Sequence, residues 1–148
     1  MTDLVIQRRV ASKGVPAPAS LRRFAEAALG RNQGELTLRI VGKTESRALN
    51  RRYRGRDKAT NVLSFSYGEI SPRLRPPVVL GDLVICAPVL AQEARAQGKA
   101  PMAHWAHLVV HGCLHLLGYD HEKKSAALLM EEKERKVLRR LGFPDPYG

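Results

Sequence analysis

The sequence predicts a single α+β domain with α/β-like alternation, spanning residues 1–148. Segments with the period of a strand alternate along the chain with segments that have the period of a helix, and such alternation places helices against one sheet. No linker or repeat divides the chain, and 148 residues are enough to bury a substantial hydrophobic core. We therefore expect one folded unit.

Four strands are expected, at residues 4–6, 35–41, 61–67 and 78–85. The second is the clearest, because Leu36, Leu38 and Ile40 alternate with polar residues, as in a half-buried strand. The fourth is expected to be broken at Gly81 and Asp82. The proline-rich segment 72–77 between the last two strands is expected to be an irregular loop.

Five helices are expected, at about residues 20–29, 44–55, 87–97, 101–117 and 125–141. Ser20 and Thr44 are the predicted N-caps of the first two, and Gly30, Gly55 and Gly98 follow predicted helix ends. The helix after Pro101 is apolar on nearly all sides except for a stripe of histidines. We expect it to be buried at the centre of the domain, with the histidines facing a cleft.

The histidine stripe predicts a metal site. His111 and His115 lie four residues apart on one helix face, and the chain can turn at Gly118 to bring in His121. Three imidazoles with an open fourth position are typical of a catalytic zinc site, since a structural site is normally closed by four side chains. We predict one zinc ion per chain on His111, His115 and His121, although imidazole ligands also suit other divalent metals.

The other histidines fit this set less well. His104 lies seven residues before His111, roughly 10 Å along a helix at 1.5 Å per residue, which is too far for a shared ion. His107 could pair with His111 by spacing but is remote from His121, so we interpret it as a supporting or core histidine. Cys113 points away from His111 and is not expected to be a ligand.

Gly112 bears on the substrate, because a metalloprotease of the HExxH kind carries a glutamate base at this position. The hypothesis of a peptide substrate therefore lacks a glutamate general base. Asp120 is either a base or a group that orients a ligand histidine, and we favour the second role. A glycine inside a helix also suggests that another backbone, or a substrate, approaches closely.

Charge favours a polyanionic partner. There are 25 Lys and Arg residues against 14 Asp and Glu, a formal net charge of +11, which favours nucleic acid over a membrane surface. Five cationic side chains lie within residues 51–58, where arginines offer forked donors to phosphate oxygens. No signal peptide or apolar span is evident, and the two cysteines have no disulfide spacing, so a cytoplasmic protein without membrane contact is expected.

Several motifs together resemble the YbeY family of bacterial rRNA maturation factors. The matching residues are His104–His107, His111–His121, Tyr53–Lys58 running into Asn61–Phe65, Leu80–Ile85 and Asp145–Tyr147. The resemblance covers most of the chain from about Leu36 onward, and the histidine signature is its most specific part.

The resemblance implies a small, mostly parallel sheet packed with helices. It also implies a single-strand-specific, metal-dependent endoribonuclease that acts in ribosome biogenesis on rRNA precursors, at the 3′ end of 16S rRNA. Zinc would be bound by His111, His115 and His121, and Arg54 would be the arginine that the family needs for function. Expected partners are RNA, the small ribosomal subunit and a ribosomal protein or GTPase, with no DNA.

The leading hypothesis is thus a zinc-dependent endoribonuclease, a hydrolase with Arg54 and His111 as its candidate catalytic residues. One alternative is an RNA-binding ribosome-assembly factor whose zinc is largely structural. Another is a zinc hydrolase of a different substrate. RNA cleavage and metal content distinguish these three hypotheses. The sequence does not identify a general base.

Overall fold

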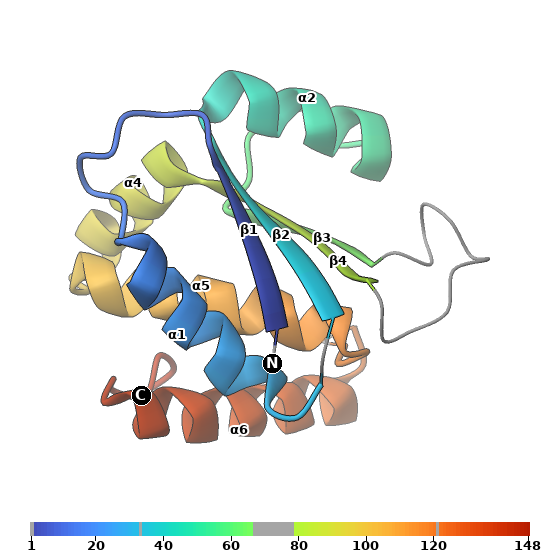
Figure 1. Ribbon diagram of the computed structural model, residues 1–148, viewed down its shortest axis with the longest axis vertical. Helices are drawn as coiled ribbons and strands as arrows, with labels where there is room; N and C mark the ends of the chain where they lie inside the picture. Colours follow the sequence, from blue (N-terminus) through green and yellow to red (C-terminus); the bar gives the residue numbers. More distant parts are fainter. Residues whose placement is uncertain (1, 33, 67–78, 121) are drawn as a thin grey trace.

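The computed structural model describes residues 2–32, 34–66, 79–120 and 122–148. Within them the chain forms one four-stranded sheet and five helices (Figure 1). The strands are β1 (Thr2–Arg8), β2 (Gly34–Val41), β3 (Val62–Ser66) and β4 (Val79–Cys86). The helices are α1 (Pro18–Leu29), α2 (Lys43–Arg54), α4 (Ala87–Gln97), α5 (Pro101–Leu116) and α6 (Lys124–Leu141). The predicted α+β class is confirmed.

The sheet is mixed, with the strand order β1-β2-β4-β3. β1 pairs with β2, and β2 with β4, in parallel, whereas β3 runs antiparallel to β4. The prediction of a mostly parallel sheet is therefore confirmed, with its one antiparallel strand at an edge. This edge strand also contacts the histidine helix α5.

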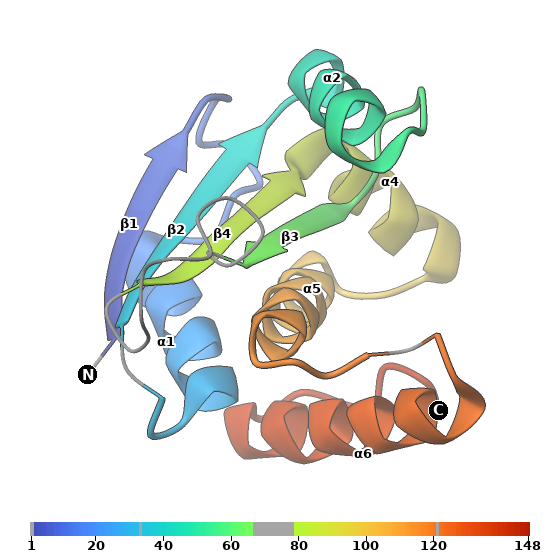
Figure 2. The same ribbon diagram turned by 90° about the vertical axis from the view of Figure 1, so that its right-hand side faces the viewer.

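The helices lie on both faces of the sheet (Figures 1 and 2). α2 lies on one face, and α1 and α5 lie on the other, with α6 packed beneath them. α5 also contacts α4 and β3, so helices and sheet surround it on several sides. This confirms the prediction that the histidine helix is central and largely buried.

Successive side chains of β2 point to opposite faces of the sheet. On β2, Leu36, Leu38 and Ile40 are fully buried in the main core against α1 and α5. The residues between them, Thr37 and Arg39, face the α2 side. A smaller cluster of five buried residues fills the space under α2: Val41, Leu63, Phe65, Val84 and Cys86. The period of two thus gives the sheet two different surfaces.

Both predicted N-caps are wrong. α1 follows Ala17 and begins with Pro18, whose fixed φ and missing N–H suit the first helical position, so Ser20 lies inside the helix. α2 follows Gly42, and Thr44 also lies inside its helix. Neither cap residue uses a side-chain hydrogen bond.

The predicted break in the fourth strand is a local irregularity in a continuous strand. Glu35 faces Val79 and Leu36 faces Gly81, so β4 contains one extra residue in this register. Gly81 has φ of 147°, and a Cβ there would lie 2.9 Å from Leu116 Cδ2. Glycine is needed because of both the backbone conformation and the close approach of α5. The proline-rich segment 72–77 and Tyr67, predicted as loop and strand end, lie outside the described residues.

In the part of the chain that the structure describes, no helix is long and apolar enough to cross a membrane.

Candidate functional site

Two of the α5 histidines that were predicted to bind metal face each other. The Nε2 atoms of His111 and His115 lie 3.1 Å apart. Two nitrogen atoms bound to one tetrahedral zinc ion lie about 3.3 Å apart, since zinc–nitrogen bonds are about 2.0–2.1 Å. The pair therefore fits a shared metal ion, and a hydrogen bond between two neutral rings gives a similar distance.

A buried carboxylate holds the other side of His111. Glu134, on α6, is completely buried, and its Oε1 atom lies 3.3 Å from Nδ1 of His111. A proton on Nδ1 that is donated to Glu134 leaves Nε2 with its lone pair directed at His115. This is the arrangement by which a carboxylate commonly fixes the tautomer and orientation of a metal-ligating histidine.

Glu134 has two further partners. His107 Nε2 lies 2.7 Å from Oε2, and the Tyr147 hydroxyl lies 3.0 Å from both oxygens. Burial alone would raise the pKa of Glu134, but the hydrogen bonds from His107 and His111 and the charges of these rings outweigh it and lower the pKa to about 2. The pKa of Tyr147 is raised by burial and by the neighbouring Glu134 charge. The carboxylate is thus ionised and surrounded by donors.

These residues also form a second candidate metal set. One donor atom each from His107, His111 and Glu134 lie within 4.8 Å of one another, close enough to hold a metal ion. In this set His111 would use Nδ1 rather than Nε2. Both histidines already hydrogen-bond to Glu134 through these atoms, and we therefore favour a supporting role for Glu134 and His107.

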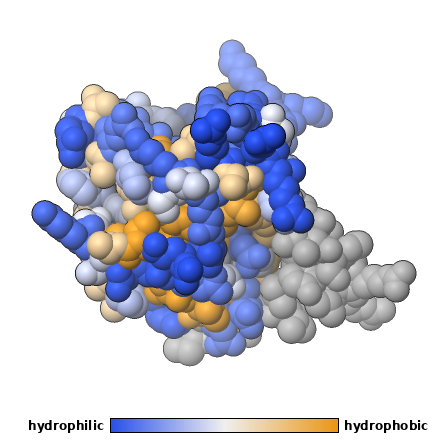
Figure 3. Space-filling model, turned by 90° about the horizontal axis from the view of Figure 1, so that it is seen from above, coloured by the Kyte–Doolittle hydropathy of each residue, from blue (hydrophilic) through white to orange (hydrophobic). Residues whose placement is uncertain are grey.

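The paired histidines open into a polar cleft of about 640 Å³. α5 supplies the histidines, β3 supplies serines, and α2 with the segment after it supplies cations. The lining includes the cations Arg54, Arg56 and Lys58, the acidic residues Asp120 and Glu122, and Ser64, His111 and His115, so the cations outnumber the acidic groups. Hydrophilic side chains also predominate on the surface seen from the α2 side (Figure 3). The lining favours an anionic ligand.

Arg54 is held at the rim of this cleft by β3. Its Nη2 donates to the carbonyl of Ser64 at 2.8 Å, and its guanidinium carbon lies 4.8 Å from the centre of the Phe65 ring. Arg54 is nevertheless exposed. Its Nη1 also donates to the carbonyl of Tyr53 at 3.3 Å, so the protein orients the side chain where it lines the cleft.

The structure brings three of the four predicted site residues, Arg54, His111 and His115, into one cleft. His121 lies outside the described residues. Asp120 is exposed, lines the same cleft, and accepts a hydrogen bond from the backbone N–H of Glu122 at 3.1 Å. No described contact joins it to His111 or His115, so its orienting role stays a prediction.

The remaining α5 predictions have clear outcomes. His104 is buried and pairs with Glu93 at 2.9 Å, apart from the paired histidines. Cys113 is fully buried, and burial raises its pKa to about 12, which confirms that it is a core residue. Close approach at Gly112 is found, but to a side chain and not to the backbone or substrate expected, since a Cβ there would lie 2.8 Å from Leu83 Cδ2. The neighbour is a side chain of β4.

The sequence interpretation missed Glu134 and Tyr147. A signal for Glu134 was present, because it lies on the inward face of α6 between Met130 and Val137, both of which are buried. An acidic residue on a buried helix face needs a partner. Tyr147 follows the last helix, and no periodic pattern places its hydroxyl against Glu134.

Facing histidines beside an oriented arginine in a polar cleft make a class of site suited to a metal ion next to a phosphate. Comparison with known proteins identifies the family. Residues 15–142 match the family model described as Endoribonuclease YbeY. The chain belongs to the YbeY endoribonuclease family.

Relatives match along most of their length. A protein of Methylococcus capsulatus named Endoribonuclease YbeY is 51% identical over 147 residues, covering 99% of this chain and 96% of the relative. One of the same name from Halorhodospira halophila is 62% identical over 116 residues, covering 77% and 75%. A solution structure of a Thermotoga maritima protein covers 95% of this chain and 89% of its own, with a TM-score of 0.64 and 26% identity.

Proposed function

We propose that this protein is a zinc-dependent endoribonuclease, a hydrolase that cuts single-stranded RNA. The observation that carries the proposal is the joint placement of Arg54, His111 and His115 in one cleft lined by further cations. The names of the relatives, Endoribonuclease YbeY, support the same activity. The net charge of +11 suits a polyanionic substrate.

The metal ligands in this proposal are His111, His115 and His121. A zinc ion on three imidazoles supplies an acidic water and a positive charge next to a phosphodiester. The protein's part is to hold the ligand nitrogens. Glu134 orients His111 through Nδ1, and the helical spacing of four residues sets His115 beside it.

Arg54 is proposed to bind the phosphate that is cut. Its planar guanidinium can donate two parallel hydrogen bonds to phosphate oxygens, and its fixed charge stabilises the negative charge that develops during attack. The contacts with Ser64 and Phe65 restrict the side chain before substrate arrives. Less of the binding energy is then lost to ordering it.

The biological substrate is proposed to be an rRNA precursor, cut at the 3′ end of 16S rRNA during ribosome biogenesis. This rests on the resemblance to the family, as does a ribosomal-protein or GTPase partner. A cytoplasmic location is proposed from the sequence pattern alone. An assembly factor that binds RNA and uses zinc mainly for its fold remains the alternative hypothesis.

The test combines metal analysis with cleavage of a labelled single-stranded RNA. The parent protein should contain about one zinc ion per chain and should cut the RNA, whereas His115→Ala should lose both zinc and activity. Arg54→Ala should keep its zinc and lose turnover. Zinc-containing parent protein that binds the RNA without cutting it would support the assembly-factor alternative instead.

A further inference from the structure

The edge strand β3 separates two clefts. Ser64 and Ser66 line the cleft with the histidines, whereas Phe65, between them, is buried in the cluster under α2. On that second side lies another cleft, of about 310 Å³. This volume is at the lower end of the range for small-ligand pockets, about 300–1,000 Å³.

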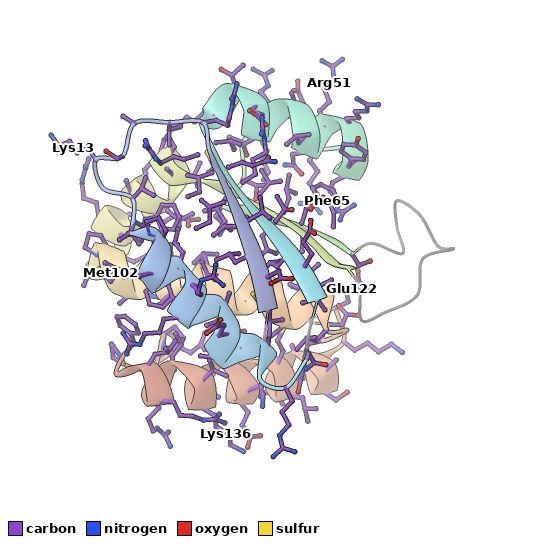
Figure 4. The ribbon with its side chains drawn as sticks, viewed as in Figure 1. Lys13, Arg51, Phe65, Met102, Glu122 and Lys136 are labelled. Carbon is purple, nitrogen blue, oxygen red and sulfur yellow. The ribbon has the colours of Figure 1, made fainter. Side chains whose placement is uncertain are left out.

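Two aromatic rings form one wall of the second cleft. Tyr53, at the end of α2, and Phe65, on β3, line it together, with ring centres 5.2 Å apart in an edge-to-face arrangement. Phe65 is 7% exposed, but Tyr53 is 49% exposed. Figure 4 labels Phe65 beneath α2. An aromatic ring half open to solvent and backed by a second ring offers a stacking surface.

An arginine lies over each of the two aromatic rings. The guanidinium carbon of Arg52 lies 5.3 Å from the centre of the Tyr53 ring, and that of Arg54 lies 4.8 Å from the centre of the Phe65 ring. Arg54 also lines the histidine cleft. It is therefore the link between the two clefts, next to the aromatic pair on one side and at the proposed phosphate position on the other.

Polar groups complete the second cleft. Thr37, Arg39 and Asp82 line it, and Asp82 is the cross-strand partner of Phe65. Hydroxyl and carboxylate groups next to an aromatic wall can hydrogen-bond the edge of a planar heterocycle, as acidic side chains do when they accept from amino groups of bases. These groups also hold one another in place, since Thr37 hydrogen-bonds to Asp82 and Arg39 donates to Glu45 and Gln7.

We propose that Tyr53 stacks against an unpaired nucleobase of the RNA, one nucleotide along the strand from the phosphate held by Arg54. This inference rests on the proposed function, because it assumes that RNA binds in the histidine cleft. The strand would cross the edge of β3 at Arg54 and place a base in the second cleft. A base in a duplex cannot leave its stack without losing its pairing, so Tyr53 would favour single-stranded substrate.

The experiment couples a change in the protein to a change in the RNA. Binding is measured by fluorescence anisotropy with a short labelled single-stranded RNA, in a His115→Ala background that keeps the RNA intact. The RNA is used whole or with a single abasic site at each position in turn. With Tyr53 present, one abasic position should weaken binding about 5- to 100-fold, the usual effect of removing a base–aromatic stack.

Three substitutions at the ring define the coupling. Tyr53→Phe keeps the ring and should keep the abasic penalty. Tyr53→Leu keeps an apolar side chain over Phe65, whereas Tyr53→Ala removes it. Each of these two variants should bind whole RNA and abasic RNA with the same affinity. If Tyr53 acts only by supporting Arg54, Tyr53→Ala will weaken both RNAs by the same factor and preserve the penalty, which overturns the inference.

If no abasic position weakens binding to the protein that carries Tyr53, the inference is overturned as well. Failure of the proposed function looks different, because the parent protein would then leave single-stranded RNA uncut, whatever the abasic scan shows. Melting temperatures close to that of the parent are required of each variant. The Leu variant keeps the test valid if the Ala variant unfolds.

Discussion

The Nδ1 atom of His111 lies 3.3 Å from Oε1 of Glu134, a carboxylate that is completely buried between α6 and α5. A buried charge is retained only when its partners compensate for its desolvation. Here the partners are two imidazoles and one phenol, and one of the imidazoles is a proposed metal ligand. The contact therefore links the packing of α6 to the orientation of the metal site.

The substitution Glu134→Gln should weaken zinc binding by about 10- to 100-fold, the usual effect of losing a group that orients a metal ligand. The amide keeps the size of the side chain but loses the charge and one acceptor. Competition with a chromophoric chelator measures the change. Glu132→Gln on the same helix, where the glutamate is exposed and pairs with Lys136, is the matched control and should bind zinc normally. Unchanged zinc affinity in Glu134→Gln would remove the orienting role.

Tyr147→Phe should lower the free energy of unfolding by about 1–2 kcal/mol, because a hydrogen bond to a charged, buried group is lost. The hydroxyl lies 3.0 Å from both oxygens of Glu134, whereas the ring itself is partly exposed. Urea denaturation measures the change. Tyr53→Phe removes a hydroxyl from a half-exposed ring and should cost much less. Equal stabilities of the two variants would argue against the Tyr147 contact.

Local patterns predicted most of the fold because each element has a clear period and end. β2 alternates, α4 ends at Gly98, and α5 begins at Pro101, as expected. The N-caps at Ser20 and Thr44 failed because proline and glycine set these helix starts instead. Cap preferences are weak compared with a fixed φ or a turn imposed by the preceding strand.

The site was predictable where its residues share one element. His111 and His115 are one helical turn apart, so helix geometry alone pairs them. Glu134 comes from another helix, and only the packing of α6 on α5 sets it against His111. The second cleft at Tyr53 likewise depends on the pairing of β3 at the sheet edge. Contacts between elements need the tertiary structure.

Gly112→Ala should destabilise the protein by about 1–2 kcal/mol, although alanine is the better helix former by about 1 kcal/mol. The new Cβ would lie 2.8 Å and 3.2 Å from the two methyl groups of Leu83, which is fully buried. Thermal or urea unfolding measures the change. The double variant with Leu83→Val should be less destabilised than the sum of the single variants, because the smaller side chain makes room. Strict additivity would show that the overlap is relieved elsewhere.

Arg51→Ala should weaken binding to single-stranded RNA and reduce the salt dependence of that binding. Arg51 is exposed on α2, the helix that also carries Arg54. Each phosphate contact on a single strand contributes about 0.7 to the slope of log K against log salt concentration. The slope should therefore fall by about 0.7 when binding is titrated at several salt concentrations, with turnover at saturating RNA retained.

Lys136→Ala removes the same charge from α6, at the opposite end of the molecule (Figure 4), and should leave the slope unchanged. If both variants lower the slope equally, the effect comes from net charge, and α2 makes no specific phosphate contact through Arg51.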